Sequence, residues 1–518
     1  MRILMINSNR HKHPWPVMPF GLGCVAAAVE RAGHATRLLD LCFSEQPEAD
    51  IRAAVKRFLP DVIAVSVRNI DNSAGFNTEF LLDDVRDRVI GPCRQMFSGP
   101  VVIGGPAVGV NGPELLAYLD VDMGIRGDGE MAVVELLRRL ETRTPLAGMP
   151  GLIRREGGRI VEDNEPMRVP NLDELAMDRV YDHVDVAAYR RYGSPLQVQT
   201  KRGCALSCSY CTYNRIEGRR WRLRDPKKVA DDIERTVERT GVRHVEFTDS
   251  TFNYPLDHCK AVLRAIIARK LNLRLRTMGL NPGAMDEELV ELMYAAGFRE
   301  VDLGAESLCD TTLRGLGKRF SKTDVLNAIA LLRRRKIAMK LFLLMGGPGE
   351  TPATARETLD AANAAMDPMD LVCLGIGLRI YKGTPIADRM TARHSVSRAD
   401  GFLRPVTFEP DGWSLTELKA LVKREAWNRP NYYMYDEDDV TPLPAQRLAT
   451  WLTKNFAPDQ PAWRQFILMR RVRKALGIAA LKRIAYGLKN RYSAPVGSQQ
   501  QVRPADWAAD HSAGSVRA

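Results

Sequence analysis

Hydrophobic and polar positions alternate along the chain in two long series of strand-like and helix-like segments. Within residues 1–145, short apolar runs predict strands, and the amphipathic stretches between them predict helices. The predicted strands are residues 3–6, 35–41, 62–67, 101–104 and 123–125, and the predicted helices are residues 21–32, 49–58, 78–90, 113–119 and 131–140. Strands alternating with helices are typical of a doubly wound, Rossmann-like α/β domain with a parallel sheet.

Three polar or glycine-rich turns follow strands of this first series. They are the segments Ser66–Asn72, Gly104–Pro106 and Gly127–Glu130. In open parallel sheets, ligands bind outside the carboxyl ends of the strands. We therefore expect residues 1–145 to form a domain that binds a ligand at these turns.

A second alternating series follows a polar connector, which we place at residues 146–190 and in which Arg154–Arg159 is typical of a hairpin turn. Its predicted strands are residues 196–200, 245–248, 273–277, 300–303, 338–344 and 372–377, and its clearest predicted helices are residues 226–240, 258–269, 286–296, 322–335 and 351–365. Six strand–helix units predict a parallel, partial (β/α)6 barrel of the TIM type over residues 191–395.

Beyond residue 395 the pattern becomes helical, and we assign residues 396–492 to a helical cap. Within it, residues 463–492 carry nine Lys or Arg and no Asp or Glu among spaced apolar residues. This basic amphipathic pattern suits peripheral contact with an anionic membrane surface, or docking of a basic helix on its own protein, which is the more ordinary outcome. Residues 493–518 are small and polar, which predicts disorder.

Composition is that of a folded chain with more than one core. The 518 residues are 45% hydrophobic and 27% charged. No run approaches the roughly 20 apolar residues of a membrane-spanning helix, and the first residues lack the apolar core of a secretory signal, so a cytoplasmic protein is expected. Much of the net charge of +12 lies in residues 463–492, so the charge does not indicate a nucleic-acid partner.

Three of the nine cysteines stand close together, and the other six are isolated. Cys204, Cys208 and Cys211 form a C-x3-C-x2-C group just after the first strand of the second series. Soft thiolates select iron–sulfur clusters or zinc. Three thiolates can hold three irons of a [4Fe–4S] cluster and leave the fourth iron open to a chelating small molecule. A zinc site would need a fourth ligand from elsewhere, so the cluster is the stronger interpretation.

This spacing at the first strand of a partial barrel resembles the radical S-adenosylmethionine (SAM) superfamily. The resemblance implies that the open iron binds SAM and that reductive cleavage of SAM yields a 5′-deoxyadenosyl radical. Further matches follow in the family's order over about residues 196–390, ending with the segment Tyr381–Pro385. The resemblance implies SAM contacts from Tyr210, before the third cysteine, from Glu306 and Ser307, after the fourth strand, and from Gly346 and Gly347, after the fifth.

The first domain resembles the cobalamin-binding domain of cobalamin-dependent radical SAM enzymes, methyltransferases among them. Met18–Gly23 matches the opening of that domain, and the later glycine turns match its loops. The Asp-x-His-x-x-Gly motif, which supplies a histidine to cobalt in other cobalamin proteins, is absent from the sequence. The resemblance implies cobalamin contacts from Ser66, Arg68, Asn69, Gly104, Gly105, Gly127 and Glu130. It places Arg68 beneath the cobalt; a surface salt bridge is the alternative role of Arg68, and a domain that binds nothing is the alternative for the whole unit.

The resemblance implies a methyltransferase that moves a methyl group from SAM, via methylcobalamin, to a weakly reactive carbon or phosphorus of a small metabolite, with natural-product or lipid biosynthesis as candidate settings. It also implies an electron donor such as flavodoxin or ferredoxin. The open alternatives are a radical cyclase or oxidase without methyl transfer, a polar cobalamin-dependent methylase, and a cobalamin-binding sensor. Polar or aromatic candidates for contact with the substrate lie near strand ends, at Tyr254, Arg276 and Tyr381, and each could equally serve packing.

Overall fold

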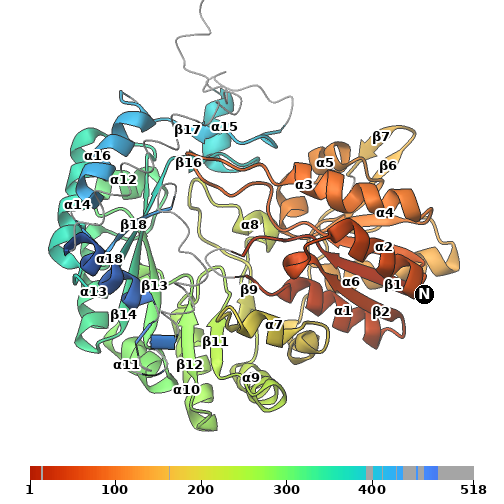
Figure 1. The fold of residues 1–518 in the computed structure, drawn as a ribbon, viewed down its shortest axis with the longest axis horizontal. Coiled ribbons are helices and arrows are strands. Elements are labelled where there is room, and N and C mark those ends of the chain that lie inside the picture. The colour runs from red at the N-terminus through yellow and green to blue at the C-terminus, as the bar shows by residue number, and fades with distance from the viewer. Residues whose placement is uncertain are drawn as a thin grey trace, which may run out of the picture.

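Two α/β units lie side by side in the computed structural model, as Figure 1 shows, with the N-terminal unit on the right and the barrel on the left. The structure describes residues 1–12, 16–162, 164–392, 401–410, 412–427, 429–435, 451–452, 455, 460–461 and 463–475.

The N-terminal unit is a seven-stranded sheet in the order β2-β1-β3-β4-β5-β6-β7. The first five strands are parallel and the last two antiparallel. The strands are β1 (Arg2–Asn7), β2 (Ala35–Asp40), β3 (Val62–Ser66), β4 (Val101–Gly104), β5 (Met123–Ile125), β6 (Leu152–Glu156) and β7 (Arg159–Val161). The predicted doubly wound domain is confirmed, and the order reverses between β1 and β3, which is where such sheets bind ligands. The β6–β7 hairpin belongs to this sheet, so part of the predicted connector extends the first unit.

Helices cover both faces of this sheet because successive strand residues point to opposite sides. The helices are α1 (Phe20–Arg31), α2 (Pro47–Phe58), α3 (Leu82–Val85), α4 (Gly91–Met96), α5 (Pro106–Leu119) and α6 (Gly129–Thr142). Ile3 and Met5 pack with α1 and α6, whereas Leu4 and Ile6 pack with α2 to α5. The helix predicted over residues 78–90 begins only at Leu82 and runs on through a π-helical turn, η2 (Arg86–Ile90), into α4.

The barrel consists of two parallel sheets, β12-β11-β8 and β13-β14-β15-β18, which isolated bridges join between β12 and β13. Its strands are β8 (Leu196–Val198), β11 (His244–Phe247), β12 (Arg274–Thr277), β13 (Glu300–Glu306), β14 (Ala338–Met345), β15 (Leu371–Ile376) and β18 (Tyr432–Met434). The six predicted strands are confirmed. The parallel strand β18 adds to them from the predicted cap, so the cap is not purely helical.

Four of the five barrel helices named next begin at a residue whose polar side chain caps the helix. They are α9 (Pro226–Thr240), α10 (Leu256–Arg269), α11 (Glu287–Ala296), α13 (Lys322–Arg334) and α14 (Pro352–Ala365). The side chains of Asp225, Asp286, Ser321 and Thr351 accept hydrogen bonds from first-turn N–H groups of α9, α11, α13 and α14. Each cap satisfies donors that lack a partner within the helix and contributes about 1 kcal/mol.

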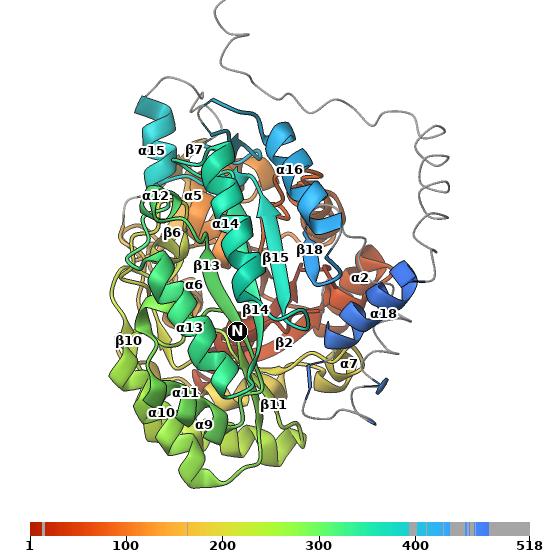
Figure 2. The same cartoon turned by 90° about the vertical axis from the view of Figure 1, so that its left-hand side faces the viewer.

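The C-terminal segment returns to the barrel through β17 (Thr407–Phe408), α16 (Leu415–Trp427) and α18 (Trp463–Ala475). Trp463 and Ile467 are buried against Ala338 at the start of β14, and Arg464 pairs with Asp370 at 2.8 Å. Figure 2 shows α18 beside the barrel and α14 across its outer surface. The start of the basic segment thus docks on its own protein. Residues 476–518, with the rest of that segment and the predicted disordered tail, lie outside the described residues.

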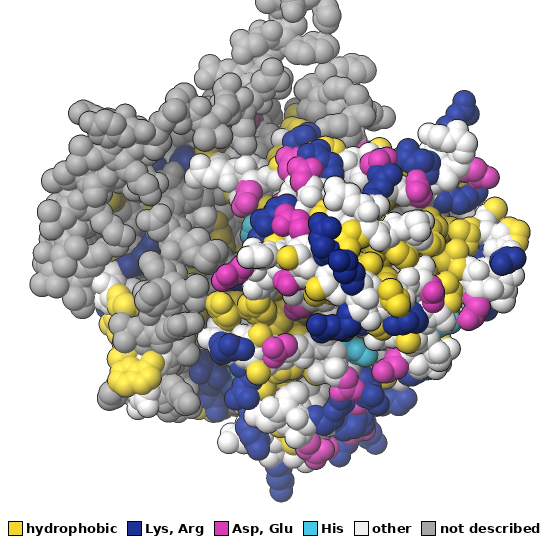
Figure 3. All heavy atoms as spheres, turned by 45° about the vertical axis from the view of Figure 1, so that its right-hand side comes forward, with side chains coloured by type: hydrophobic (Ala, Val, Ile, Leu, Met, Phe, Trp, Pro, Cys, Tyr) yellow, Lys and Arg dark blue, Asp and Glu magenta, His cyan; other side chains and the backbone are white. Residues whose placement is uncertain are grey.

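The surface charges and the helices bear on whether a nucleic acid or a membrane is a partner of the protein. Figure 3 shows Lys and Arg interspersed with Asp and Glu over the face that carries the N-terminal unit. Within the described part of the chain, no helix combines the length and the apolar character that crossing a bilayer requires. Membrane contact through residues 463–492 stays a prediction.

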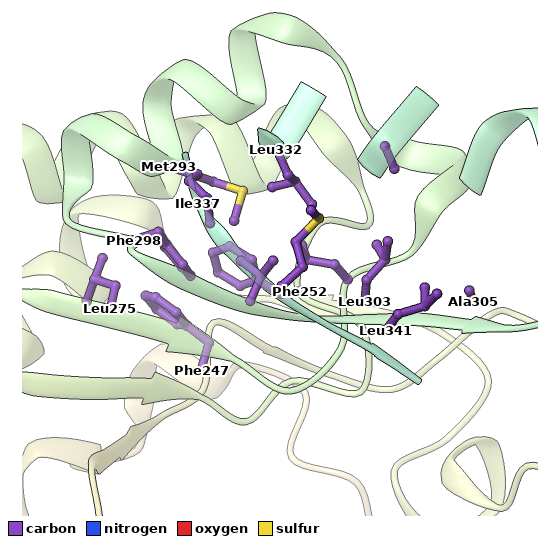
Figure 4. Packing of buried hydrophobic residues seen from close by; sticks show 14 of the residues in the cluster. Phe247, Phe252, Leu275, Met293, Phe298, Leu303, Ala305, Leu332, Ile337 and Leu341 are labelled. Carbon is purple, nitrogen blue, oxygen red and sulfur yellow. The ribbon is translucent and has the colours of Figure 1, made fainter. Parts of the chain in front are cut away.

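The core of the barrel lies between its strands and outer helices. Phe247, Phe252 and Phe298 stack there with ring centroids 4.5 to 5.9 Å apart. Figure 4 shows them beside Leu303 and Leu341, which point the same way from β13 and β14. Because side chains alternate along a strand, their sequence neighbours face the barrel interior, and this alternation places polar residues inside the barrel.

Candidate active site

The three cysteines lie on a loop held at both ends and from one side. The loop follows β9 (Lys201–Arg202), which pairs with β10 (Arg222–Leu223), and the Cys204 N–H donates to Gly218 O at 3.0 Å. The Ser209 N–H donates to Leu316 O at 2.8 Å. A Cβ atom on Gly317 would lie 2.8 Å from Ser207 O, so only glycine lets this turn approach the loop so closely. Backbone contacts with the rest of the barrel therefore hold the cysteine loop in place.

The three thiols share one space. Cys204 is buried, and Cys208 and Cys211 are partly buried. Burial raises the pKa of the Cys208 thiol above its ordinary value and that of Cys211 to about 12, and Cys204 adds to both increases. A four-iron cluster binds each thiolate to a different iron, so three neighbouring thiols on one loop suit such a cluster.

Glu306 lies beside the cysteine loop in a bonded triad. The Tyr210 hydroxyl donates to Glu306 Oε1 at 2.9 Å, and Lys318 Nζ lies 2.9 Å from Oε2. Burial and then the Glu306 carboxylate raise the pKa of Tyr210 well above its ordinary value. Burial disfavours the Lys318 ammonium, but Glu306, Tyr210 and Cys208 together outweigh this effect and raise the pKa of Lys318 well above the usual range. The triad therefore holds a neutral phenol and a charged ammonium at neutral pH.

Ser307, Gly346 and Gly347 lie in well-bonded surroundings. The Ser307 hydroxyl is buried, 2.8 Å from Thr358 Oγ1, and accepts from the Cys309 N–H at 3.1 Å. The N–H groups of Gly346 and Gly347 both donate to the Glu350 carboxylate. SAM contacts from these three residues stay a prediction.

Arg68 lies where the two units meet. It is exposed, and loss of hydration lowers the pKa of its guanidinium, while the neighbouring groups Tyr213 and Glu246 of the barrel raise it. Tyr213 is likewise 44% exposed, while burial raises its pKa to about 12, so its phenol is neutral at neutral pH. Because Tyr213 follows Cys211 by two residues, Arg68 lies on the side of the N-terminal unit that faces the cysteine loop.

The turn after β4 packs closely against the Arg68 loop. Gly105 has φ of +97°, and a Cβ atom there would lie 2.7 Å from Val67 O and 3.1 Å from Ser66 Oγ. At Gly104 the nearest atom to such a Cβ is Ile125 O, at 4.0 Å. Asn69 is exposed next to Arg68. The two turns together form a cradle of backbone groups, and its contact with cobalamin, through Ser66, Arg68, Asn69, Gly104 and Gly105, stays a prediction.

Gly127 and Glu130 lie where the two units join. The Glu130 carboxylate accepts from Arg202 Nη2 of the barrel at 2.6 Å, and its side chain is 3% exposed. Asp128 bonds to Arg222 and to the Val169 N–H. This turn therefore has a structural role between the units, and its contact with cobalamin stays a prediction.

Two family models match the chain at these two places. The Radical SAM superfamily model matches residues 198–362, which include the cysteine loop. The B12 binding domain model matches residues 13–137, which include the Arg68 loop and its cradle.

The chain belongs to the radical SAM enzymes that carry a B12-binding domain.

Similar proteins share both units. Tryptophan 2-C-methyltransferase of Streptomyces laurentii is 26% identical over 442 residues, 74% of this chain and 73% of that protein. Anaerobic magnesium-protoporphyrin IX monomethyl ester cyclase of Synechocystis sp. is 26% identical over 352 residues, 65% and 67% of the two proteins. The structure of the radical SAM methyltransferase TsrM from Kitasatospora setae with tryptophan and a SAM analogue is 29% identical and covers 76% of each chain with a TM-score of 0.69. A TsrM structure with cobalamin and a [4Fe-4S] cluster covers 92% and 99% of the two chains at 23% identity, TM-score 0.79, and shows the same fold.

The three candidate substrate residues of this radical SAM enzyme lie in different places. Arg276 is buried inside the barrel, with Nε 2.9 Å from Glu246 Oε1 and Nη2 3.2 Å from Asp302 Oδ2. The Tyr254 ring packs on Trp221 at 5.0 Å. The Tyr381 hydroxyl bonds to the N-terminal unit. The structure thus brings only Arg276 into the barrel interior, and sequence reasoning missed Lys318, which no motif marks.

Arg202 is expected to be important for the stability of this enzyme. Its side chain is 7% exposed and lies against Glu130 and, at 3.7 Å, Asp128. An Arg202→Ala substitution leaves a buried carboxylate without its charged partner, which costs about 3–5 kcal/mol of the free energy of unfolding. Urea unfolding should show this loss, whereas Arg219→Ala, at an exposed neighbour, should change stability little. Equal effects of the two substitutions would contradict this role.

The carboxyl group of Glu350 should make the stability of the enzyme depend on pH. Burial raises its pKa from the usual 4.5 to about 7, although the N–H groups of Gly346 and Gly347 lower it. Between these values the folded state holds a proton that the unfolded chain has lost. The contribution is therefore full below pH 4.5 and is lost as the pH rises through about 7. A Glu350→Gln variant should lose less stability than the wild type between about pH 5 and about pH 8.

The control for this prediction is Glu357→Gln on α14, the helix that begins two residues after Glu350. Glu357 pairs with Lys322 at 2.9 Å, and this hydrogen bond lowers the pKa of its carboxyl group. Its removal should therefore not flatten the decline of stability toward alkaline pH. The prediction is wrong if wild type and Glu350→Gln lose the same free energy over that range.

Proposed function

We propose that this enzyme is a cobalamin-dependent methyltransferase that moves a methyl group from SAM to a weakly reactive carbon of a small metabolite. The observation that carries the proposal is a close contact between the two units: a Cβ atom on Gly109, four residues after Gly105, would lie 3.3 Å from Ile216 Cα, five residues after Cys211. It joins the turn expected to hold a corrin to the loop of the three cysteines. Both cofactors would therefore reach one reaction space, as transfer of a methyl group between them requires.

Each unit has residues suited to its cofactor. A [4Fe–4S] cluster on Cys204, Cys208 and Cys211 supplies an electron for cleavage of SAM when bound, and cobalamin in the cradle at Gly105 supplies a carrier for a methyl group. The triad of Tyr210, Glu306 and Lys318 would orient SAM, because its carboxylate is held in one position from both sides. Arg68 would occupy the space on one side of the corrin and keep other ligands away.

The substrate would bind at the mouth of the barrel. Met278 and Tyr435 follow the ends of β12 and β18 and are 59% and 46% exposed. The Tyr435 ring stacks on Phe342 with centroids 5.9 Å apart. Inside the barrel, Lys340 lies 3.1 Å from Asp302, and Asp302 also pairs with Arg276. These charged side chains are therefore paired with one another. Such a site suits a small metabolite with a flat apolar part and few charges.

Reduction of the cluster needs an electron donor, for which flavodoxin or ferredoxin is our expectation. Similarity to tryptophan 2-C-methyltransferase supports methyl transfer to carbon, and similarity to the cyclase keeps a radical reaction without methyl transfer as the second candidate.

The products formed from SAM test this proposal. Protein purified without oxygen and reconstituted with iron, sulfide and cobalamin is reduced and mixed with SAM, and S-adenosylhomocysteine and 5′-deoxyadenosine are measured. S-adenosylhomocysteine that requires added cobalamin supports the methyltransferase, and accompanying 5′-deoxyadenosine supports a radical route. 5′-Deoxyadenosine alone, from protein that binds no cobalamin, contradicts methyl transfer and favours the cyclase-like alternative.

A further inference from the structure

A finger of the N-terminal unit, residues 70–80, reaches from the Arg68 loop onto the barrel. Its two sides are joined by an antiparallel bridge between Asp71 and Phe80, and the Leu81 N–H donates to Ile70 O at 2.9 Å. At its tip, Gly75 lies against the backbone of Ile376, the last residue of β15, where a side chain would have no room. The finger thus starts two residues after Arg68 and ends on the barrel sheet.

Asp71 is the charged centre of this contact. Its side chain is fully buried, with Oδ2 2.8 Å from Arg379 Nε and Oδ1 3.1 Å from the Tyr381 hydroxyl. Tyr381 also lies 2.6 Å from Ser73 Oγ of the finger. Arg379 Nη2 donates further to Phe402 O at 2.9 Å. Both oxygens of Asp71 are therefore held by residues of the barrel.

The barrel segment that holds Asp71 also packs on the cysteine loop. The Ile386 N–H donates to Ser209 O at 3.0 Å, between Cys208 and Cys211. Ile380 and Ile386 form one apolar cluster with Leu316, against which Tyr210 packs. A continuous path of bonded and packed residues therefore runs from Arg68, through Asp71 and the segment after β15, to the cysteine loop.

We propose that Asp71 is a positioning residue, whose bonds to Arg379 and Tyr381 fix the Arg68 loop relative to the cysteine loop. The inference rests on the proposed function, because it gives Arg68 its place beside the corrin. Asp71→Asn keeps the size of the side chain but removes the charge that pairs with the buried Arg379 guanidinium. The finger then loosens, and Arg68 no longer keeps water from the lower face of the corrin.

The test compares Asp71→Asn with Glu114→Gln. Glu114 pairs with Lys382, one residue after Tyr381, so this control removes a different ion pair between the same two units. For each protein loaded with cobalamin, the absorption and electron paramagnetic resonance spectra of the cob(II)alamin form report whether a water molecule binds the cobalt. The amount of S-adenosylhomocysteine formed from SAM is measured in parallel.

The inference predicts that Asp71→Asn shifts both spectra toward those of water-bound cob(II)alamin and slows S-adenosylhomocysteine formation about tenfold or more, whereas Glu114→Gln retains the wild-type spectra. If Asp71→Asn does not fold, Tyr381→Phe, which removes one of the two bonds to Asp71, should give a smaller shift in the same direction. Wild-type spectra in the Asp71 or Tyr381 variant, or equal shifts in the control, overturn the inference. Failure of the wild type itself to bind cobalamin would instead overturn the proposed function.

Discussion

A Cys208→Ala variant should lose its iron–sulfur cluster and, with it, the cleavage of SAM. Cys208 is the central ligand of a loop that has only three cysteines, so no nearby cysteine can replace it. Substitution of residues that hydrogen-bond to a metal ligand typically lowers metal affinity or activity about 10- to 100-fold. Loss of the ligand itself should have a larger effect. Iron and sulfide content after anaerobic reconstitution, and the yield of 5′-deoxyadenosine, measure the effect.

The matched control is Cys93→Ala in α4 of the N-terminal unit. Cys93 is fully buried among apolar residues, and burial raises the pKa of its thiol. It is therefore a packing residue, and its variant should retain iron, sulfide and SAM cleavage. Wild-type iron content and SAM cleavage in Cys208→Ala would show that the cluster, if present, is held elsewhere.

Gly105→Ala should weaken cobalamin binding by about tenfold or more, since each tenfold loss corresponds to only about 1.4 kcal/mol. The added methyl group would lie 2.7 Å from Val67 O, and φ of +97° is unfavourable for alanine. Relief of this clash moves the turn away from the loop of Ser66 and Arg68. Titration of the protein with cobalamin, followed by absorption, measures the change in affinity.

The control variant Gly33→Ala tests whether backbone strain alone, without disturbance of the cradle, weakens cobalamin binding. Gly33 also has positive φ, +86°, but a Cβ atom there would meet nothing within 4 Å. This variant should therefore lose some stability and keep its cobalamin affinity. If both variants bind cobalamin as the wild type does, the turn after β4 does not form the site.

The sequence was sufficient to predict the two units because their periodicities are strong. Apolar runs identify most strands of both units, and amphipathic stretches identify most of the helices between them. The finger was missed because residues 78–80 continue a helical pattern, while their bridge to Asp71 depends on tertiary contact. The strand β18 has three residues, which is too few for an alternation of apolar and polar positions to predict a strand.

The site was predictable only where its residues are close in the sequence. The cysteine loop carries its own spacing, but Lys318 joins Glu306 through a turn that no pattern marks. The bond between Asp71 and Arg379 spans 308 residues and cannot be inferred from one sequence. The ion pair of Glu130 was not predicted, because its partner Arg202 comes from the other unit.

The central claim is that a methyl group passes from SAM to cobalamin where the two units meet. The most direct measurement uses SAM with a carbon-13-labelled methyl group and reduced protein that carries cluster and cobalamin, without any methyl acceptor. The account predicts that the labelled methyl group is recovered with the protein-bound cobalamin, together with an equal amount of S-adenosylhomocysteine. Cobalamin that remains unlabelled while SAM is converted to 5′-deoxyadenosine would contradict it.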